Sequence, residues 1–539
     1  MQPPDEIGTE TGLLRSTAQV SAITALARLV GFARWIVLGL TVGTTYLGNV
    51  YQTANWIPNI LFEVAAGGVL AAVLVPTFVE EIARRPDQGM RVASAIANTM
   101  LLASLPLVVA GVVLGRPIMG ALLAGVEDAA VRERQVELGT WFLRFFLPQI
   151  PLYLLGMVMQ GILHAHRRFV LPALAPLLSS LTVIATYVIF WALGPGATLE
   201  TVTIAQLYVL AVGTTLGVVV LSLCQLPAVL RLGVRWRPVL GLGDPALRYA
   251  VRAGGWGAVY VAVTQAGLIV SLLLANRVEG GVVAFQIAYA FFELPNALAG
   301  LPVAITLFPS LARAFVERQE ERFAELLSKG WRIVVLVAAP AAAGLFVLAP
   351  TLTDALLGWT PSADGSLVAA TLRGLALGVP AWALVATLSR SFYARQRTAP
   401  PVVMNATAMA VYAATAFGIT WVTGVTGPLA MGVLGLGLGV GHVAGAAVGT
   451  GLLARAVRGW PTRTDLAAVA ATLVRSAAVG AAALAVTRLM DGLPSALVAA
   501  SGVAAGLVVF AVLAHRSPDL RGAAGLLTRG RAPLGERTT

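Results

Sequence analysis

Charged side chains are scarce in this chain, and their scarcity excludes an ordinary soluble protein. Of its 539 residues, 12% are charged and 58% are hydrophobic, whereas a soluble domain carries about 25% charged residues. Apolar runs of about 18 to 25 residues recur from one end to the other, and each is long enough to cross a bilayer as a helix. The composition therefore predicts an all-α polytopic membrane protein.

Cysteine and histidine are scarce as well. Cys224 is the only cysteine and there are four histidines, so neither a disulfide framework nor a cysteine-based metal site is available. No residue spacing is typical of a metal site, of a phosphate-binding glycine loop or of an activated nucleophile. We therefore expect no catalytic residue, no metal and no cofactor, and a transporter rather than an enzyme.

The formal net charge of +12 would suit nucleic acid if the basic residues formed one patch. Instead they lie in short clusters between apolar runs, which is the pattern of cytoplasmic loops. We expect no nucleic-acid partner. Because the basic clusters follow the even-numbered runs, both termini are expected on the cytoplasmic side of a bacterial inner membrane.

Apolar runs and the breakers between them predict about fourteen spans. They lie near residues 15–42, 49–79, 91–115, 137–162, 170–193, 203–230, 246–275, 281–311, 327–356, 367–391, 400–423, 428–454, 466–490 and 493–514.

Two pairs of segments, each about 230 residues apart, indicate an internal repeat. Asn55–Pro76 and Phe292–Pro309 both read Pro-Asn, then small residues, then a later proline. His164–Pro172 and Tyr393–Pro401 form the second pair, with the same spacing to the final proline. Each copy would hold an even number of spans, so both copies should have the same orientation, with a site between them.

The repeat predicts two pseudo-symmetric six-helix lobes followed by two C-terminal helices. The expected parts are a cytoplasmic tail at 1–14, an N-lobe at 15–232, a cytoplasmic linker at 233–245, a C-lobe at 246–458, helices thirteen and fourteen at 459–514, and a cytoplasmic tail at 515–539.

Polar side chains form stripes inside the predicted spans, where even on the milder scale a charge costs about 2.5 to 3.5 kcal/mol. Arg28 lies on a polar face of span one, and Arg34 lies deeper in the same span. Spans two and eight repeat the arrangement. The residues on one helical face are Gln52, Asn55, Asn59 and Glu63 in span two, and Gln286, Tyr289, Glu293 and Asn296 in span eight. We expect these faces to line a common hydrated interior.

Other interpretations of the charged residues remain open at this point. Arg28 and Arg34 could form structural pairs with Glu63 or Glu293. Arg252 in span seven could meet substrate or extend to the cytoplasmic interface. Two arginines in the first span favour an anionic substrate, because an exporter of cations is expected to present carboxylates there.

Three segments carry a family resemblance. They are LLRSTAQVSAITALARLVGFARW near the start, the segment from IPN to LVP in span two, and LPNALAGLPVAITLFPSLARAF in span eight. They resemble the MurJ/MviN-type lipid II flippases of the multidrug/oligosaccharidyl-lipid/polysaccharide exporter superfamily. The resemblance covers essentially the whole chain. It implies fourteen helices and the translocation of an undecaprenyl-pyrophosphate-linked peptidoglycan precursor to the outer leaflet, with Arg28 and Arg34 as cavity arginines.

The chain also departs from the family pattern. Where the family commonly has an acidic residue after the second arginine, this chain has Trp35, and where many members have a paired arginine in span two, it has Phe62 and Glu63. A common glutamate of span two is Gly67 here, and the expected arginine of span seven is Leu272. The pattern FEVAAGGVL resembles the actinobacterial branch. Some members are thought to bind sodium through acidic residues of spans seven and eleven, which are absent here, so the membrane potential is the expected driving force.

These observations lead to one functional hypothesis, alternating-access flipping of lipid II for cell-wall synthesis. Its substrate-binding residues are expected to be Arg28, Arg34, Asn55, Asn59, Glu63, Arg252, Gln286, Glu293 and Asn296. Expected partners are membrane lipids and proteins of cell-wall synthesis or division. The alternatives are a superfamily exporter of another polyprenyl-linked glycan, of drugs or of ions, and a non-transporting scaffold for cell-wall synthesis.

Overall fold

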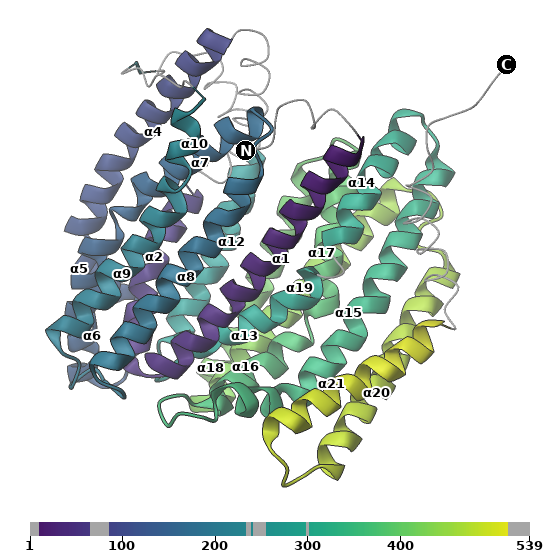
Figure 1. The fold of residues 1–539 in the computed structure, drawn as a ribbon. Coiled ribbons are helices and arrows are strands. Elements are labelled where there is room, and N and C mark those ends of the chain that lie inside the picture. Colours follow the sequence, from purple (N-terminus) through teal and green to yellow (C-terminus); the bar gives the residue numbers. More distant parts are fainter. Residues whose placement is uncertain (1–9, 65–85, 233–238, 241–254, 298–300, 516–539) are drawn as a thin grey trace. The chain divides into compact units, whose positions relative to one another are not determined.

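The computed structural model describes residues 10–64, 86–232, 239–240, 255–297 and 301–515 (Figure 1). Every regular element in these ranges is a helix, which confirms the all-α prediction. The chain divides into two compact units. Unit 1 comprises Met1–Ile287 with Thr360–Asp364, and unit 2 comprises Ala288–Trp359 with Gly365–Thr539.

Unit 1 is built from ten helices within its described residues and the first part of an eleventh. They are α1 (Glu10–Thr41), α2 (Tyr46–Phe62), α4 (Pro86–Val113), α5 (Gly115–Leu122), α6 (Ala129–Phe146), α7 (Gln149–Ala165), α8 (Val170–Leu193), α9 (Ile204–Leu223), α10 (Leu226–Leu230), α12 (Gly255–Ala275) and the start of α13 (Gly281–Pro295).

Four of the helix–helix contacts in unit 1 decide where its polar residues lie. Helix α1 packs along α8, and α8 packs along α9 (Figure 1). Helix α2 packs against α6 and α7. Side-chain caps fix several helix starts: the Thr45 hydroxyl accepts from Gly48 N, and Thr203 and Gln206 form a capping box at the start of α9.

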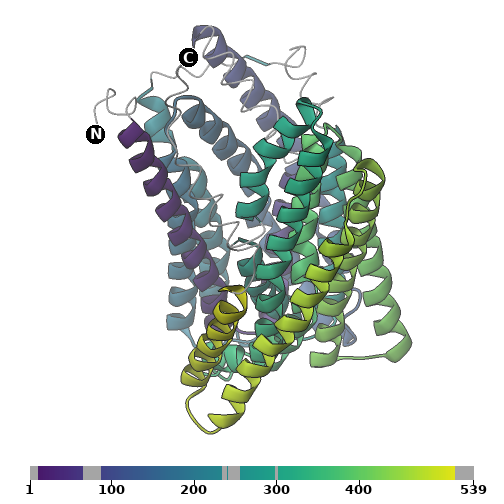
Figure 2. The ribbon, with the colours of Figure 1, turned by 90° about the vertical axis from the view of Figure 1, so that its right-hand side faces the viewer.

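Unit 2 holds the end of α13 and eight further helices among its described residues. These are α14 (Leu301–Val316), α15 (Glu320–Leu357), α16 (Gly365–Ala376), α17 (Val379–Ala394), α18 (Ala399–Thr423), α19 (Gly427–Ala456), α20 (Arg463–Leu489) and α21 (Ser495–His515). Helices α20 and α21, yellow in Figure 2, pack against each other and against α15.

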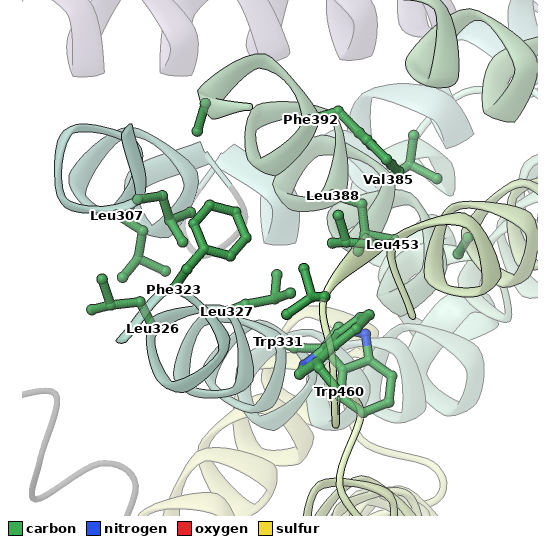
Figure 3. Packing of buried hydrophobic residues seen from close by; sticks show 14 of the residues in the cluster. Leu307, Phe323, Leu326, Leu327, Trp331, Val385, Leu388, Phe392, Leu453 and Trp460 are labelled. Carbon is green, nitrogen blue, oxygen red and sulfur yellow. The ribbon is translucent and has the colours of Figure 1, made fainter. Parts of the chain in front are cut away.

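A hydrophobic core in unit 2 joins α14, α15 and α17 to the end of α19 (Figure 3). Phe323 is fully buried, and the rings of Trp331 and Trp460 meet edge to face with centroids 5.7 Å apart. Edge-to-face contact is a preferred aromatic geometry. The long helix α15 is therefore anchored at its first turns.

Glycines allow the backbones of α16 and α19 to lie in direct contact. A Cβ on Gly374 would lie 2.4 Å from the carbonyl oxygen of Gly432, and a Cβ on Gly435 would lie 2.3 Å from that of Thr371. No side chain fits between these backbones. The glycine-rich run in α19 is thus a packing surface, as small residues commonly are in membrane helices.

Ten of the described helices are long and apolar enough to cross a membrane, and twelve spans result if each of two bent helix pairs counts as one. The pairs bend by 65° between α4 and α5 and by 49° between α16 and α17. The chain is a multi-pass membrane protein. The count of fourteen stays a prediction, because parts of predicted spans two, seven and eight lie outside the described residues.

The predicted repeat has a counterpart in two turns with the same backbone structure. Arg167 ends α7 with φ of 56°, and Gln396 ends α17 with φ of 57°. In the first turn Arg167 N donates to His164 O and Arg168 N to Leu163 O, and the bonds at Gln396 and Arg397 follow the same pattern. Both turns are Schellman motifs.

Candidate substrate-binding site

Arg34 is a half-buried cation on α1 without a carboxylate partner in the described part of the chain. Its guanidinium carbon lies 4.7 Å from the ring centroid of Trp35, and its Nε is buried without a hydrogen-bond partner. The ion pairs among the described residues involve other groups. A pair between Arg34 and Glu63 is therefore not formed, and the same holds for Arg28, whose side chain is exposed.

Tyr153 of α7 packs against the C-terminal part of α2. Its ring lies against Phe62, with centroids 5.1 Å apart. One turn before Phe62, Asn59 Nδ2 donates to Asn55 O at 2.8 Å. The two asparagines of the predicted stripe thus lie next to the contact between α2 and α7.

A second polar cluster lies deeper in unit 1 and is closed to ligands. The Tyr51 hydroxyl lies 2.6 Å from Thr214 Oγ1 and 3.3 Å from the Tyr187 hydroxyl, and Gln52 Nε2 donates to Tyr187 at 3.4 Å. Tyr51 and Gln52 are fully buried. Gln52 shares the predicted stripe with Asn59, but here it belongs to the interior of unit 1 rather than to an open face.

The N-terminal end of α2 is held by a buried asparagine. Asn49 Nδ2 donates to Val278 O at 2.8 Å, and Val282 N donates to Asn49 Oδ1 at 3.0 Å. One turn on, the Thr53 hydroxyl donates to Asn276 Oδ1 at 3.1 Å. These bonds fix the register of α2 against the turn between α12 and α13, and hence the position of Asn55 and Asn59.

The remaining predicted site residues have different surroundings. Glu63 and Glu293 are exposed. Gln286 is 3% exposed and its amide atoms have no hydrogen-bond partner within the described chain, and Asn296 Oδ1 is in the same situation. Arg252 lies outside the described residues.

Reasoning from the sequence missed Tyr153. A tyrosine inside the aliphatic run of α7 fits an ordinary core position, and only its ring contact with Phe62 of α2 distinguishes it. The pattern YLLGMVMQ offered one signal, a polar aromatic residue in an aliphatic run.

A pocket of about 690 Å³ lies elsewhere in unit 1, among loops near Thr44, Trp191 and Thr198, and Glu279 and Asp364 lie in its wall. Two carboxylates make it unsuitable for a pyrophosphate. Tyr46 begins α2 beside it, where burial and the carboxylates of Glu279, Asp128 and Glu127 raise the pKa of the phenol. This pocket therefore does not match the anionic headgroup expected from the sequence.

Solved structures share this fold. A lipid II flippase MurJ in an inward closed conformation aligns with 92% of this chain and 97% of its own, with a TM-score of 0.72 and 18% identity. An inward-facing multidrug resistance MATE family transporter of the MOP superfamily aligns with 81% of this chain and 97% of its own, with a TM-score of 0.64 and 19% identity. The fold is that of multi-pass membrane transporters of this type.

Comparison of sequences identifies the protein family. The family model for lipid II flippase MurJ matches residues 39–501. The lipid II flippase MurJ of Burkholderia cenocepacia is 28% identical over 399 residues, which are 72% of this chain and 75% of that protein. The probable lipid II flippase MurJ of Vibrio cholerae is 27% identical over 407 residues, which are 74% and 75% of the two chains. The chain belongs to the lipid II flippase MurJ family, and the predicted resemblance is confirmed.

Proposed function

We propose that this protein flips lipid II, the undecaprenyl-pyrophosphate-linked peptidoglycan precursor, from the cytoplasmic to the outer leaflet of a bacterial inner membrane. Arg34 is the observation that carries the proposal. A cation within a membrane-spanning helix is costly unless it is paired or hydrated, and Arg34 has no carboxylate partner within the described chain. An anionic headgroup would supply the missing charge, and membership of the MurJ family supports this choice of substrate.

The headgroup offers chemistry that matches the side chains of the site. The guanidinium groups of Arg34 and Arg28 can bind pyrophosphate oxygens in a bidentate manner. Sugar and peptide groups would hydrogen-bond to the amides, and the polyprenyl tail would stay in lipid. The residues assigned to amide and charge contacts are Asn55, Asn59, Glu63, Arg252, Gln286, Glu293 and Asn296.

Translocation requires no covalent chemistry, so the protein acts as a transporter. Two six-helix lobes would alternate between inward and outward exposure of the headgroup. Moving one charge through a potential of 100 mV provides about 2.3 kcal/mol, which makes the membrane potential a sufficient driving force without a metal or nucleotide. Both termini would be cytoplasmic, and proteins of cell-wall synthesis or division would associate with the transporter.

The deciding experiment measures lipid II in the outer leaflet of cells depleted of this protein and then supplied with wild type, Arg34→Ala or Arg475→Ala at equal membrane levels. Arg475 is the control, because it is an exposed arginine in another span, α20. We expect wild type and Arg475→Ala to restore outward lipid II and Arg34→Ala to fail. If depletion leaves outward lipid II unchanged in cells without another flippase, the function is that of another exporter or of a scaffold.

A further inference from the structure

We propose that the pocket near Thr44 in unit 1 binds an organic cation through an ammonium group. The pocket encloses about 690 Å³, and the described members of the proposed substrate-binding set are absent from its wall. It is therefore a second binding site, and the inference does not depend on the proposed function.

Three segments of unit 1 meet at Thr44 and build the pocket wall. Thr44 N donates to Ser362 O at 2.9 Å, and Asp364 N donates to the Thr44 hydroxyl. A Cβ on Gly280 would lie 2.3 Å from the carbonyl oxygen of Thr44, so the turn between α12 and α13 touches the same residue. The backbones that carry Glu279 and Asp364 are therefore both fixed at Thr44 before a ligand binds.

The charge of the wall favours a cation. Glu279 and Asp364 are exposed residues that line the pocket, and no lysine, arginine or histidine of the described chain lines it. Glu279 takes part in none of the ion pairs formed among the described residues. The nearby Arg277 lies against Gly125, where an added Cβ would meet its Cγ at 2.5 Å. The pocket therefore attracts positive charge and repels anions.

Size and aromatic surface favour an organic cation over a metal ion. Sites for small molecules commonly enclose about 300 to 1,000 Å³, and this pocket lies within that range. Trp191 lines it and is 48% exposed, and Pro195 and Pro361 add apolar surface. The face of a tryptophan ring attracts ammonium groups. Two carboxylates beside an aromatic and apolar wall thus match an alkyl ammonium ion.

Two sources present this chemistry, a soluble amine and the headgroup of phosphatidylethanolamine. The test titrates the protein, purified in a maltoside detergent, with the diamine cadaverine by calorimetry. The neutral analogue 1,5-pentanediol and the dianion glutarate test the requirement for positive charge. The cadaverine titration is then repeated in the presence of phosphatidylethanolamine.

The variants are Glu279→Gln, Asp364→Asn and Trp191→Leu, and the melting temperature of each is recorded. The control is Glu200→Gln, because Glu200 is an exposed carboxylate of the loop between α8 and α9 that does not line the pocket. The two amide substitutions keep the size of the side chain, so we expect unchanged melting temperatures for both.

We expect wild type and Glu200→Gln to bind cadaverine equally, and neither to bind pentanediol or glutarate. Each amide variant should bind cadaverine about tenfold more weakly, and Trp191→Leu about threefold more weakly. Competition by phosphatidylethanolamine assigns the site to the lipid headgroup, and its absence assigns the site to a soluble amine.

Three results overturn the inference. The first is a wild type that does not bind cadaverine, and the second is equal binding of cadaverine and pentanediol. The third is equal affinity of Glu279→Gln and Glu200→Gln for cadaverine, which would show that the cation is attracted only by the overall surface charge.

Discussion

The hydroxyl of Ser328 donates a 2.8 Å hydrogen bond to Oδ2 of Asp465 and so ties α15 to the start of α20. The same carboxylate accepts from the backbone and hydroxyl of Thr462 at 3.0 and 2.7 Å, and Arg332 Nε lies 3.4 Å from its other oxygen. Its side chain is 3% exposed. One buried carboxylate thus serves as helix cap, interhelical acceptor and counter-ion.

Replacing this carboxylate should destabilise unit 2. Asp465→Ala removes a buried counter-ion of Arg332 and the Asp465 half of the capping box that starts α20, so we expect a loss of about 3 kcal/mol in unfolding free energy. Thermal unfolding of the purified protein in detergent measures the change. The control is Glu325→Gln, which removes the exposed pairs with Arg322 and Lys329 and should cost less than about 1 kcal/mol. Equal melting temperatures for the two variants would contradict the assigned role of Asp465.

The α16–α19 contact should not tolerate a methyl group. We expect Gly374→Ala and Gly435→Ala each to destabilise the protein by about 1 to 3 kcal/mol, because the new Cβ would overlap backbone atoms of the facing helix. Gly344 and Gly418 lie inside helices with nothing within 4 Å of an added Cβ. Alanine at these two positions should leave stability unchanged or raise it by up to about 1 kcal/mol, and a uniform response of all four variants would argue against close packing at α16 and α19.

The two hydrogen bonds of the Asn49 side chain, to Val278 O and from Val282 N, should be essential for folding of unit 1. Asn49→Ala leaves the buried Val282 N–H without its partner and removes one of the two donors to Val278 O, which should cost about 1 to 3 kcal/mol. The yield of monodisperse protein after size-exclusion chromatography is a direct measurement. Thr24→Val provides the comparison, since it removes an exposed hydrogen bond within α1, from Thr24 Oγ1 to Val20 O, and should leave the yield unchanged. Normal yield of Asn49→Ala would show that α2 is held without the two Asn49 hydrogen bonds.

The role of Arg34 can also be tested by a change that preserves its charge. Arg34→Lys retains a cation but lacks the planar fork that binds two phosphate oxygens, so we expect lipid II transport in reconstituted vesicles to fall about tenfold without a change in melting temperature. Arg475→Lys should transport as wild type does. Full activity of Arg34→Lys would mean that charge alone is required.

Helix positions followed closely from the sequence wherever an apolar run has strong breakers at both ends. The predicted span 170–193 coincides with α8 because Arg167 and Arg168 precede it and Gly194 follows it. The predicted span 400–423 begins one residue after α18 begins and ends at the same residue. The helix ends there because Gly424 takes a left-handed conformation. In each case the local chemistry is sufficient to end the helix.

Breaks inside the apolar runs were not predicted. The segment 367–391 was expected to be one helix, but α16 ends at Ala376 and α17 begins at Val379. A Cβ on Gly378 would lie 2.5 Å from Gly439 Cα, so the break occurs where another helix approaches. That approach depends on residues some sixty positions away, which hydrophobic periodicity does not report.

The site was predicted only in part for a related reason. Helical spacing puts Gln52, Asn55 and Asn59 on one face, but it does not say what covers that face. Tyr187 covers the Gln52 end, whereas the half-buried Asn59 donates to Asn55 O of its own helix. The neighbours of a stripe are set by tertiary packing, and they separate structural amides from those that can contact a ligand.

The turns at Arg167 and Gln396 share their main-chain hydrogen bonds but not their side chains, and Arg318 ends α14 with φ of 57° and the same two bonds. One of the three corner residues is neutral and two are cationic. These turns share only their backbone conformation. Arg167, Arg318 and Gln396 are therefore positions at which the surface charge can change while the fold stays the same.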